Sequence, residues 1–131
     1  MPHLQFEINK KIDPSLKEKF VISVRKIFGD VMKTDTDHVA VSLREYDKDN
    51  LSIGRSSYQG HVCLMNLDIR IGREIEKRRQ LATEYFILVN TLFKIDKENQ
   101  YITFTEHKGE DFHLIEKYLD NWVANDKPLS D

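Results

Sequence analysis

Apolar and polar residues alternate at the start of the chain, and the apolar positions then change to steps of three and four. In residues 3–9, Leu4, Phe6 and Ile8 alternate with polar side chains, which predicts a half-buried strand. Asp13-Pro14 follows, a favoured N-cap residue before a proline suited to the first helical position. The next apolar residues recur at helical spacing and predict one buried stripe: Leu16, Phe20, Val24, Ile27, Phe28 and Val31.

The same order of elements then returns at an offset of about sixty residues, a period that indicates a repeated supersecondary unit. Residues 39–46 predict the second strand, and the polar, turn-rich residues 47–60 predict a hairpin or an extended arm. Residues 61–69 are richer in apolar side chains and predict a central strand. Residues 100–106 predict a fourth strand. Residues 74–94 predict a second amphipathic helix, whose apolar stripe is Ala82, Tyr85, Phe86, Val89, Leu92 and Phe93.

Two β-α-β units predict an α/β (α+β) fold in which a four-stranded sheet carries both helices on one face. We expect one domain, with residues 1–58 as the first unit and its linking arm, 59–108 as the second unit, and 109–131 as a short C-terminal helix and tail. We also expect apolar residues from at least two strands on the uncovered face of the sheet. Self-association is the simplest way to cover such a face.

Composition excludes several classes of partner. The chain has 131 residues and a net charge of −2, which fits one compact domain and provides no basic excess for nucleic acid. We expect no membrane span and no signal peptide, because no apolar run is long enough for either role. Cys63 is the only cysteine, so no internal disulfide forms, which suits a cytoplasmic location. Its apolar surroundings favour a buried, inert thiol.

Pro2 is the first candidate for chemistry. Methionine is usually trimmed before a small residue such as proline, and trimming would leave Pro2 with a secondary amine that can take and return protons. A proline is also tolerated as the first residue of a strand for purely structural reasons. Position alone leaves both interpretations open.

Three features together resemble the tautomerase superfamily: the opening MPHLQFE, the stretch of residues 61–86 and the Gly72-Arg73 pair before the second helix. The sequence is most similar to the 5-carboxymethyl-2-hydroxymuconate isomerases, enzymes of aromatic degradation. The resemblance implies a homotrimer in which three sheets face inward. It also implies that Pro2, without Met1, is the catalytic base and that Arg73 binds a substrate carboxylate.

The other arginines match the superfamily unevenly. Arg44 lies in the second strand, where the isomerases use an arginine, although a surface charge fits it better. Arg70 stands three residues before Arg73, a spacing similar to the paired arginines of the cis-3-chloroacrylic acid dehalogenases, and a solvated strand end fits it equally well. Residues 53–57, IGRSS, are similar to a loop of malonate semialdehyde decarboxylase. Thr103 stands where the hydrating branches have a tyrosine, which weakens a hydratase interpretation.

The expected function is therefore a cofactor-independent tautomerase or isomerase acting on a small unsaturated carboxylate. Arg70 and Arg73 would bind the carboxylate and lower the pKa of the Pro2 amine. A decarboxylase or hydratase on the same scaffold, or a non-catalytic trimeric binding module, remain alternatives. The five histidines have no metal-ligand spacing, so we expect no metal. His107 is a strand-end histidine or a proton carrier, and Tyr101 either packs or donates a hydrogen bond to substrate.

Overall fold

A computed structural model describes residues 2–56 and 60–115 of the chain. The predicted C-terminal helix after residue 115 lies outside the described residues. Three short 3-10 turns accompany the main elements: η1 (Lys48–Asn50), η2 (Lys97–Asn99) and η3 (Gly109–Asp111). The strands and long helices are β1 (His3–Ile8), α1 (Pro14–Met32), β2 (Ala40–Glu45), β3 (Cys63–Arg70), α2 (Ile75–Phe93) and β4 (Gln100–His107).

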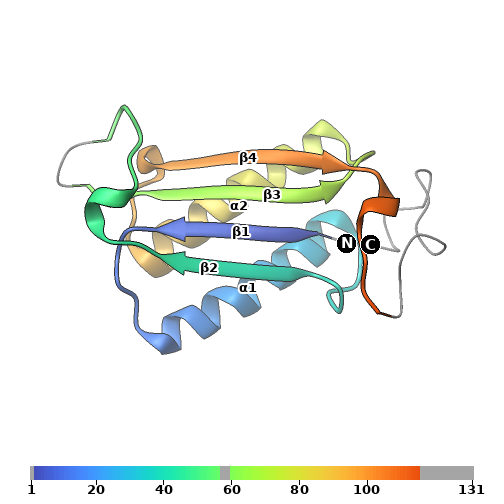
Figure 1. Ribbon diagram of the computed structural model, residues 1–131, viewed down its shortest axis with the longest axis horizontal. Coiled ribbons are helices and arrows are strands. Elements are labelled where there is room, and N and C mark those ends of the chain that lie inside the picture. The colour runs from blue at the N-terminus through green and yellow to red at the C-terminus, as the bar shows by residue number, and fades with distance from the viewer. Residues whose placement is uncertain (1, 57–59, 116–131) are drawn as a thin grey trace.

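The strands form one four-stranded sheet in the order β2-β1-β3-β4. β1 is parallel to β2 and β3 is parallel to β4, while the central strands β1 and β3 are antiparallel. Both helices lie behind the same face of the sheet (Figure 1). The predicted pair of β-α-β units is thus confirmed, and the antiparallel central pair relates the two units by an approximate twofold. Each helix even ends on a lysine in the left-handed conformation, Lys33 and Lys94.

The core lies between the sheet and the two helices. Phe6 of β1 packs edge-on against Phe20 of α1 and Tyr85 of α2, with ring centroids 4.9 and 5.6 Å away. The Tyr85 hydroxyl donates to the backbone oxygen of Val24 at 2.9 Å and so joins the helices. Leu81, absent from the predicted stripe of α2, is fully buried as well. Other fully buried core side chains are Leu4, Ile8, Phe28, Cys63, Leu67, Ile69 and Val89.

The face of the sheet opposite the helices, here called the open face, is polar. Apolar residues lie on more than one strand of this face, as predicted, but they are few among mostly polar neighbours, so the face does not by itself require an apolar cover. Strand register turns the apolar residues of all four strands toward the helices and leaves Leu64, Ala40 and Tyr101 as the apolar or aromatic exceptions. The other residues of this face include His3, Gln5, Glu7, Ser42, Arg44, Asn66, Asp68, Thr103, Thr105 and His107.

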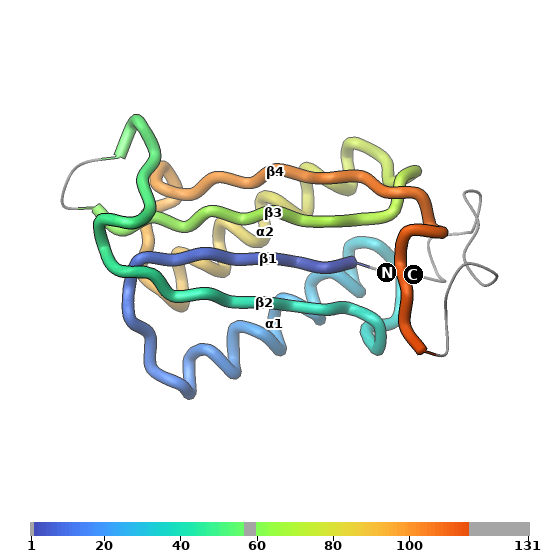
Figure 2. Tube along the Cα trace, viewed as in Figure 1, coloured from blue at the N-terminus to red at the C-terminus, as the bar shows by residue number. Residues whose placement is uncertain are grey.

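Three of the residues predicted to take part in the chemistry, Pro2, Arg70 and Arg73, lie at one end of the sheet. Because β1 runs antiparallel to β3 and β4, β1 begins at the end where β3 and β4 finish. The turn that leads into α2 and the segment that follows β4 start from the same end (Figures 1 and 2). Neither long helix within the described ranges is apolar enough for its length to cross a membrane.

Candidate active site

Pro2 stands at the head of β1 and is buried. Its carbonyl oxygen accepts a hydrogen bond from the backbone N–H of Ala40 at 3.0 Å, which ties this end of the chain to β2. The antiparallel register pairs His3 with Asp68, so Pro2 lies beside Ile69 of β3. The strand pairing on both sides therefore fixes the position of the residue predicted to be the base.

Arg70 and Arg73 border the same end of the sheet and are both buried. Arg70 is the last residue of β3 and is 3% exposed, and Arg73 is 6% exposed. The alternative interpretation of Arg70 as a solvated strand end is therefore wrong. The turn between them requires Gly72, whose φ of 108° lies in a region that side chains with a Cβ rarely adopt. The turn is anchored to β4 by a hydrogen bond of 2.7 Å from the Ile71 N–H to the His107 carbonyl oxygen.

Burial lowers the pKa of Arg73 to about 10, and the nearby positive charge of Arg70 adds to this effect. The two guanidiniums thus lie close enough to repel each other in a region with little water. An arrangement that holds two buried cations is suited to an anion, because a carboxylate would offset both desolvation and repulsion. It would also disfavour the protonated form of a neighbouring amine.

Arg44 lies toward the opposite end of the sheet. It pairs with Glu7, five residues along β1 from Pro2. At about 3.3 Å per residue, this separation is roughly 16 Å. Arg44 is exposed, and its Nη1 donates to the Gln5 Oε1 at 3.3 Å. One chain therefore does not bring Arg44 to Pro2, and its role as a substrate ligand stays a prediction that requires a second copy.

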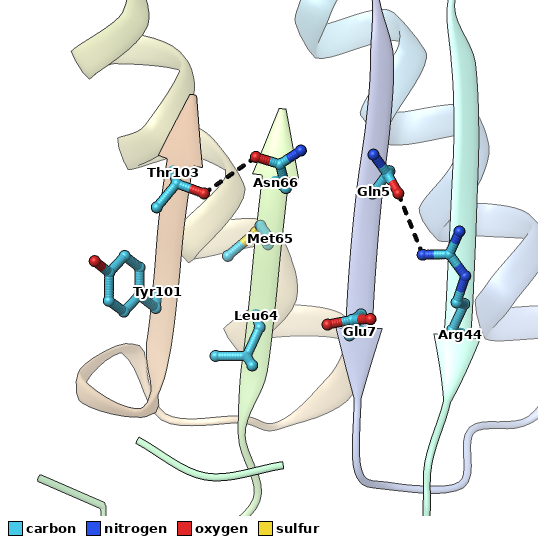
Figure 3. A pocket seen from close by; sticks show the side chains of 8 residues that line it. All are labelled: Gln5, Glu7, Arg44, Leu64, Met65, Asn66, Tyr101 and Thr103. Atoms are coloured by element: carbon cyan, nitrogen blue, oxygen red, sulfur yellow. Dashed lines mark hydrogen bonds between the residues drawn. The ribbon is translucent and has the colours of Figure 1, made fainter. Parts of the chain in front are cut away.

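A hollow of about 320 Å³ crosses the open face near Arg44 (Figure 3). Leu64 and the 54%-exposed ring of Tyr101 give it an apolar side, and Glu7 and Arg44 give it a charged side. Glu7 accepts a hydrogen bond of 2.8 Å from the Tyr46 hydroxyl, and this bond raises the pKa of Tyr46. The hollow includes none of Pro2, Arg70 and Arg73, so it is separate from the candidate active site.

Asp68 is a residue that the sequence reasoning missed. Its Oδ2 accepts hydrogen bonds from Gln5 at 2.7 Å and from Asn66 at 3.1 Å, and its Oδ1 lies 2.9 Å from the His107 Nε2. His107 is the last residue of β4, and its side chain is half-buried. A signal was available, because Asn66, Asp68 and Arg70 occupy every second position of a central strand and must share one face.

The remaining candidates lie away from Pro2 or have structural roles. Cys63 is buried, and burial raises the pKa of its thiol, as expected for an inert cysteine. Thr103 donates to the Asn66 Oδ1 at 3.1 Å. Residues 53–56 of the loop resembling a decarboxylase lie in the arm at the other end of the sheet (Figure 1), and residue 57 is outside the described residues. Within the described ranges, no group of three or more His, Cys, Asp or Glu side chains could hold a metal.

Two consecutive β-α-β units whose central strands are antiparallel define the fold. Several solved structures share this fold. A fused 4-OT, solved as a symmetric trimer, superposes with a TM-score of 0.78 at 16% identity, covering 93% of this chain and 95% of that one. A macrophage migration inhibitory factor-like protein from Entamoeba histolytica gives 0.74 at 18% identity, covering 86% and 94%.

A third structural relative is FG41 malonate semialdehyde decarboxylase inhibited by 3-bromopropiolate, with a TM-score of 0.72, 12% identity and coverage of 85% and 87%. No family model and no curated protein sequence matches the chain. At these identities the structural likeness establishes the fold. The chemistry must be argued from the residues, and the closer similarity to the 5-carboxymethyl-2-hydroxymuconate isomerases stays a prediction.

Proposed function

We propose that this protein is a cofactor-independent tautomerase or isomerase that uses Pro2, after removal of Met1, as its general base. The substrate is a small unsaturated acid, such as a 2-hydroxy enol acid of the 5-carboxymethyl-2-hydroxymuconate type. Arg73 and Arg70 bind its carboxylate. The reaction moves a proton from an enol oxygen or allylic carbon to a carbon further along the conjugated system.

One observation carries this proposal: Pro2 is buried at the same end of the sheet as two buried arginines. A guanidinium loses hydration when it is buried, and a bound carboxylate would offset part of that loss. Two buried cations at the end of the sheet that holds Pro2 are therefore suited to an anionic substrate. The lowered pKa of Arg73 supports the same view, because a bound carboxylate would offset its cause.

The chemistry follows from the two charges. The free amine of Pro2 takes the proton, and negative charge develops on the oxygen conjugated to the reacting carbon. An arginine or a backbone N–H near that oxygen stabilises the charge, and the arginines that hold the carboxylate fix the orientation of the substrate. The same prolinium then returns the proton to the distant carbon, which closes the cycle with no change in the enzyme.

We further propose that the protein works as a homotrimer. The fused 4-OT relative was solved as a symmetric trimer, and Arg44 can reach a site containing Pro2 only from another copy. Decarboxylation of a β-keto acid is the second candidate, favoured by the likeness to malonate semialdehyde decarboxylase and by the same pair of arginines. A hydratase is less well supported because Thr103 stands where the hydrating branches have a tyrosine.

Intact-mass measurement and an enol assay test the proposal. The purified protein should lack Met1 and should ketonise phenylenolpyruvate. Pro2→Ala should abolish this activity, while Pro14→Ala, at the exposed start of α1, should leave it unchanged. Retention of Met1 in active protein, or full activity of Pro2→Ala, would refute the role of Pro2. Inertness toward enols together with turnover of malonate semialdehyde would select the decarboxylase, and inertness toward both would leave a binding module.

A further inference from the structure

His107 stands where three segments meet at the Pro2 end of the sheet. It is the last residue of β4 and pairs with Arg70, the last residue of β3. Its carbonyl oxygen holds the N–H of Ile71 at 2.7 Å, in the turn that leads to Arg73. His107 therefore contacts both segments that carry the buried arginines: the end of β3, with Arg70, and the turn that leads to Arg73.

The side chain of His107 is fixed on one side by Asp68. Only 18% of the Asp68 side chain is exposed, and its Oδ2 is already occupied by Gln5 and Asn66. A carboxylate can only accept, so the His107 Nε2 donates to Oδ1 over 2.9 Å. This hydrogen bond holds the His107 ring against the open face of β3, beside Asp68.

The other side of the ring contacts residues 108–112, here called the strap. The Asp111 Oδ2 lies 4.0 Å from the His107 Nδ1, and the Phe112 ring meets the imidazole edge-on at 5.5 Å between centroids. Gly109 within the strap is buried. Figures 1 and 2 show the chain after β4 crossing the end of the sheet at which β1 begins, which is the end that holds Pro2.

We infer that His107, held by Asp68, is a positioning residue for the candidate active site at the Pro2 end of the sheet. Its carbonyl fixes the turn that carries Arg73, and its ring anchors the strap across the end of the sheet. The inference rests on the proposed function for its catalytic consequence, but the anchoring itself can be measured without any substrate.

The neighbours of His107 distinguish a positioning role from general packing. Its ring contacts the carboxylates of Asp68 and Asp111 and the ring of Phe112, and its backbone pairs with that of Arg70. Replacement by phenylalanine keeps a flat ring that can pack against Phe112 but cannot donate to Asp68. Glutamine can place an amide N–H near the position of Nε2 and should restore the anchor.

Limited trypsin digestion after Lys108, followed by mass spectrometry, reports on the strap directly. We expect cleavage there to become at least about tenfold faster in His107→Phe and to return toward the wild-type rate in His107→Gln. His61→Phe is the matched control, since His61 contacts the Asn9 carbonyl oxygen at the opposite end of the sheet. If His107→Phe does not fold, Asp68→Asn removes one of the acceptor oxygens and provides the same comparison.

Steady-state kinetics give the second readout. We expect the KM for phenylenolpyruvate to rise about tenfold in His107→Phe with kcat within twofold of wild type, because the strap and turn border the carboxylate-binding arginines rather than the reacting carbon. An unchanged cleavage rate after Lys108, or a loss of kcat at constant KM, would overturn the inference. A wild-type protein inert toward enols would refute the proposed function, while faster cleavage in His107→Phe would still support the anchor.

Discussion

Removing the positive charge of Arg73 should stabilise the fold while impairing the proposed reaction. The substitution is Arg73→Met, which keeps a long apolar stem in the same space and discards the guanidinium. Arg73 is 6% exposed, and the net effect of its surroundings is to lower its pKa. The interactions of the guanidinium in the folded protein therefore do not fully compensate for the hydration that it loses on folding.

The magnitude follows from the pKa. At about 1.4 kcal/mol for each pKa unit, the lowering of the Arg73 pKa to about 10 corresponds to roughly 3 kcal/mol. Methionine cannot replace every interaction of the arginine side chain, so we expect the free energy of unfolding to rise by only about 1–3 kcal/mol. Below about pH 10 the Arg73 guanidinium is protonated in both the folded and the unfolded wild-type chain. The gain in the free energy of unfolding from Arg73→Met is therefore constant from about pH 6 to 9. It declines only above about pH 10, where the native wild-type guanidinium gives up its proton first.

Urea unfolding monitored by circular dichroism measures the effect. The matched control is Arg79→Met at an exposed position of α2, and its free energy of unfolding should lie within about 0.5 kcal/mol of wild type. Arg70→Met should relieve the same repulsion, so the double variant should be stabilised by less than the sum of the two single variants. Destabilisation by Arg73→Met of more than about 1 kcal/mol would refute the reasoning, because the charge would then be more than compensated. Additive single effects would show that the two guanidiniums do not interact.

Three further changes test the scaffold by the same unfolding measurement. Tyr85→Phe removes the buried hydroxyl that donates to Val24, and should cost about 1 kcal/mol. Asn9→Ala removes the buried amide that binds the connection between β2 and β3, and should cost about 2 kcal/mol and speed amide hydrogen exchange in that connection. Lys33→Gly and Lys94→Gly relieve a φ of 57° at the ends of the helices, and should each stabilise by about 0.5–1 kcal/mol.

The fold could be predicted from the sequence because its hydrophobic patterns are long and consistent. Leu4, Phe6 and Ile8 alternate over a whole strand and are all fully buried, as the period of two requires. The structure trims most predicted elements by one or two residues at an end, where local hydrogen bonds decide the boundary. Leu81 was missed because it lies just before the stripe that the sequence indicated in α2.

The site was only partly predictable, because burial of a charged side chain depends on neighbours distant in sequence. The spacing of Arg70 and Arg73 was visible, but a solvated pair has the same spacing. The Asp68–His107 contact joins two strands and could be anticipated only from the parallel register of β3 and β4. The polarity of the open face was hard to predict for a related reason: the number of apolar residues in a strand does not show how many of them lie on each side of the sheet.

Because the open face is mostly polar, burial of apolar area alone does not account for a trimer. Contacts through Gln5, Glu7 and Arg44 would depend on hydrogen bonds and charge, and they bury little apolar area. Since Arg44 lies roughly 16 Å along β1 from Pro2 in one chain, its proposed role requires a neighbouring copy. Specific activity should then fall on dilution in parallel with dissociation measured by light scattering, and Arg44→Met should raise the KM of the assembled protein. Full specific activity in a sample shown to be monomeric would remove Arg44 from the site and make the single chain a complete enzyme.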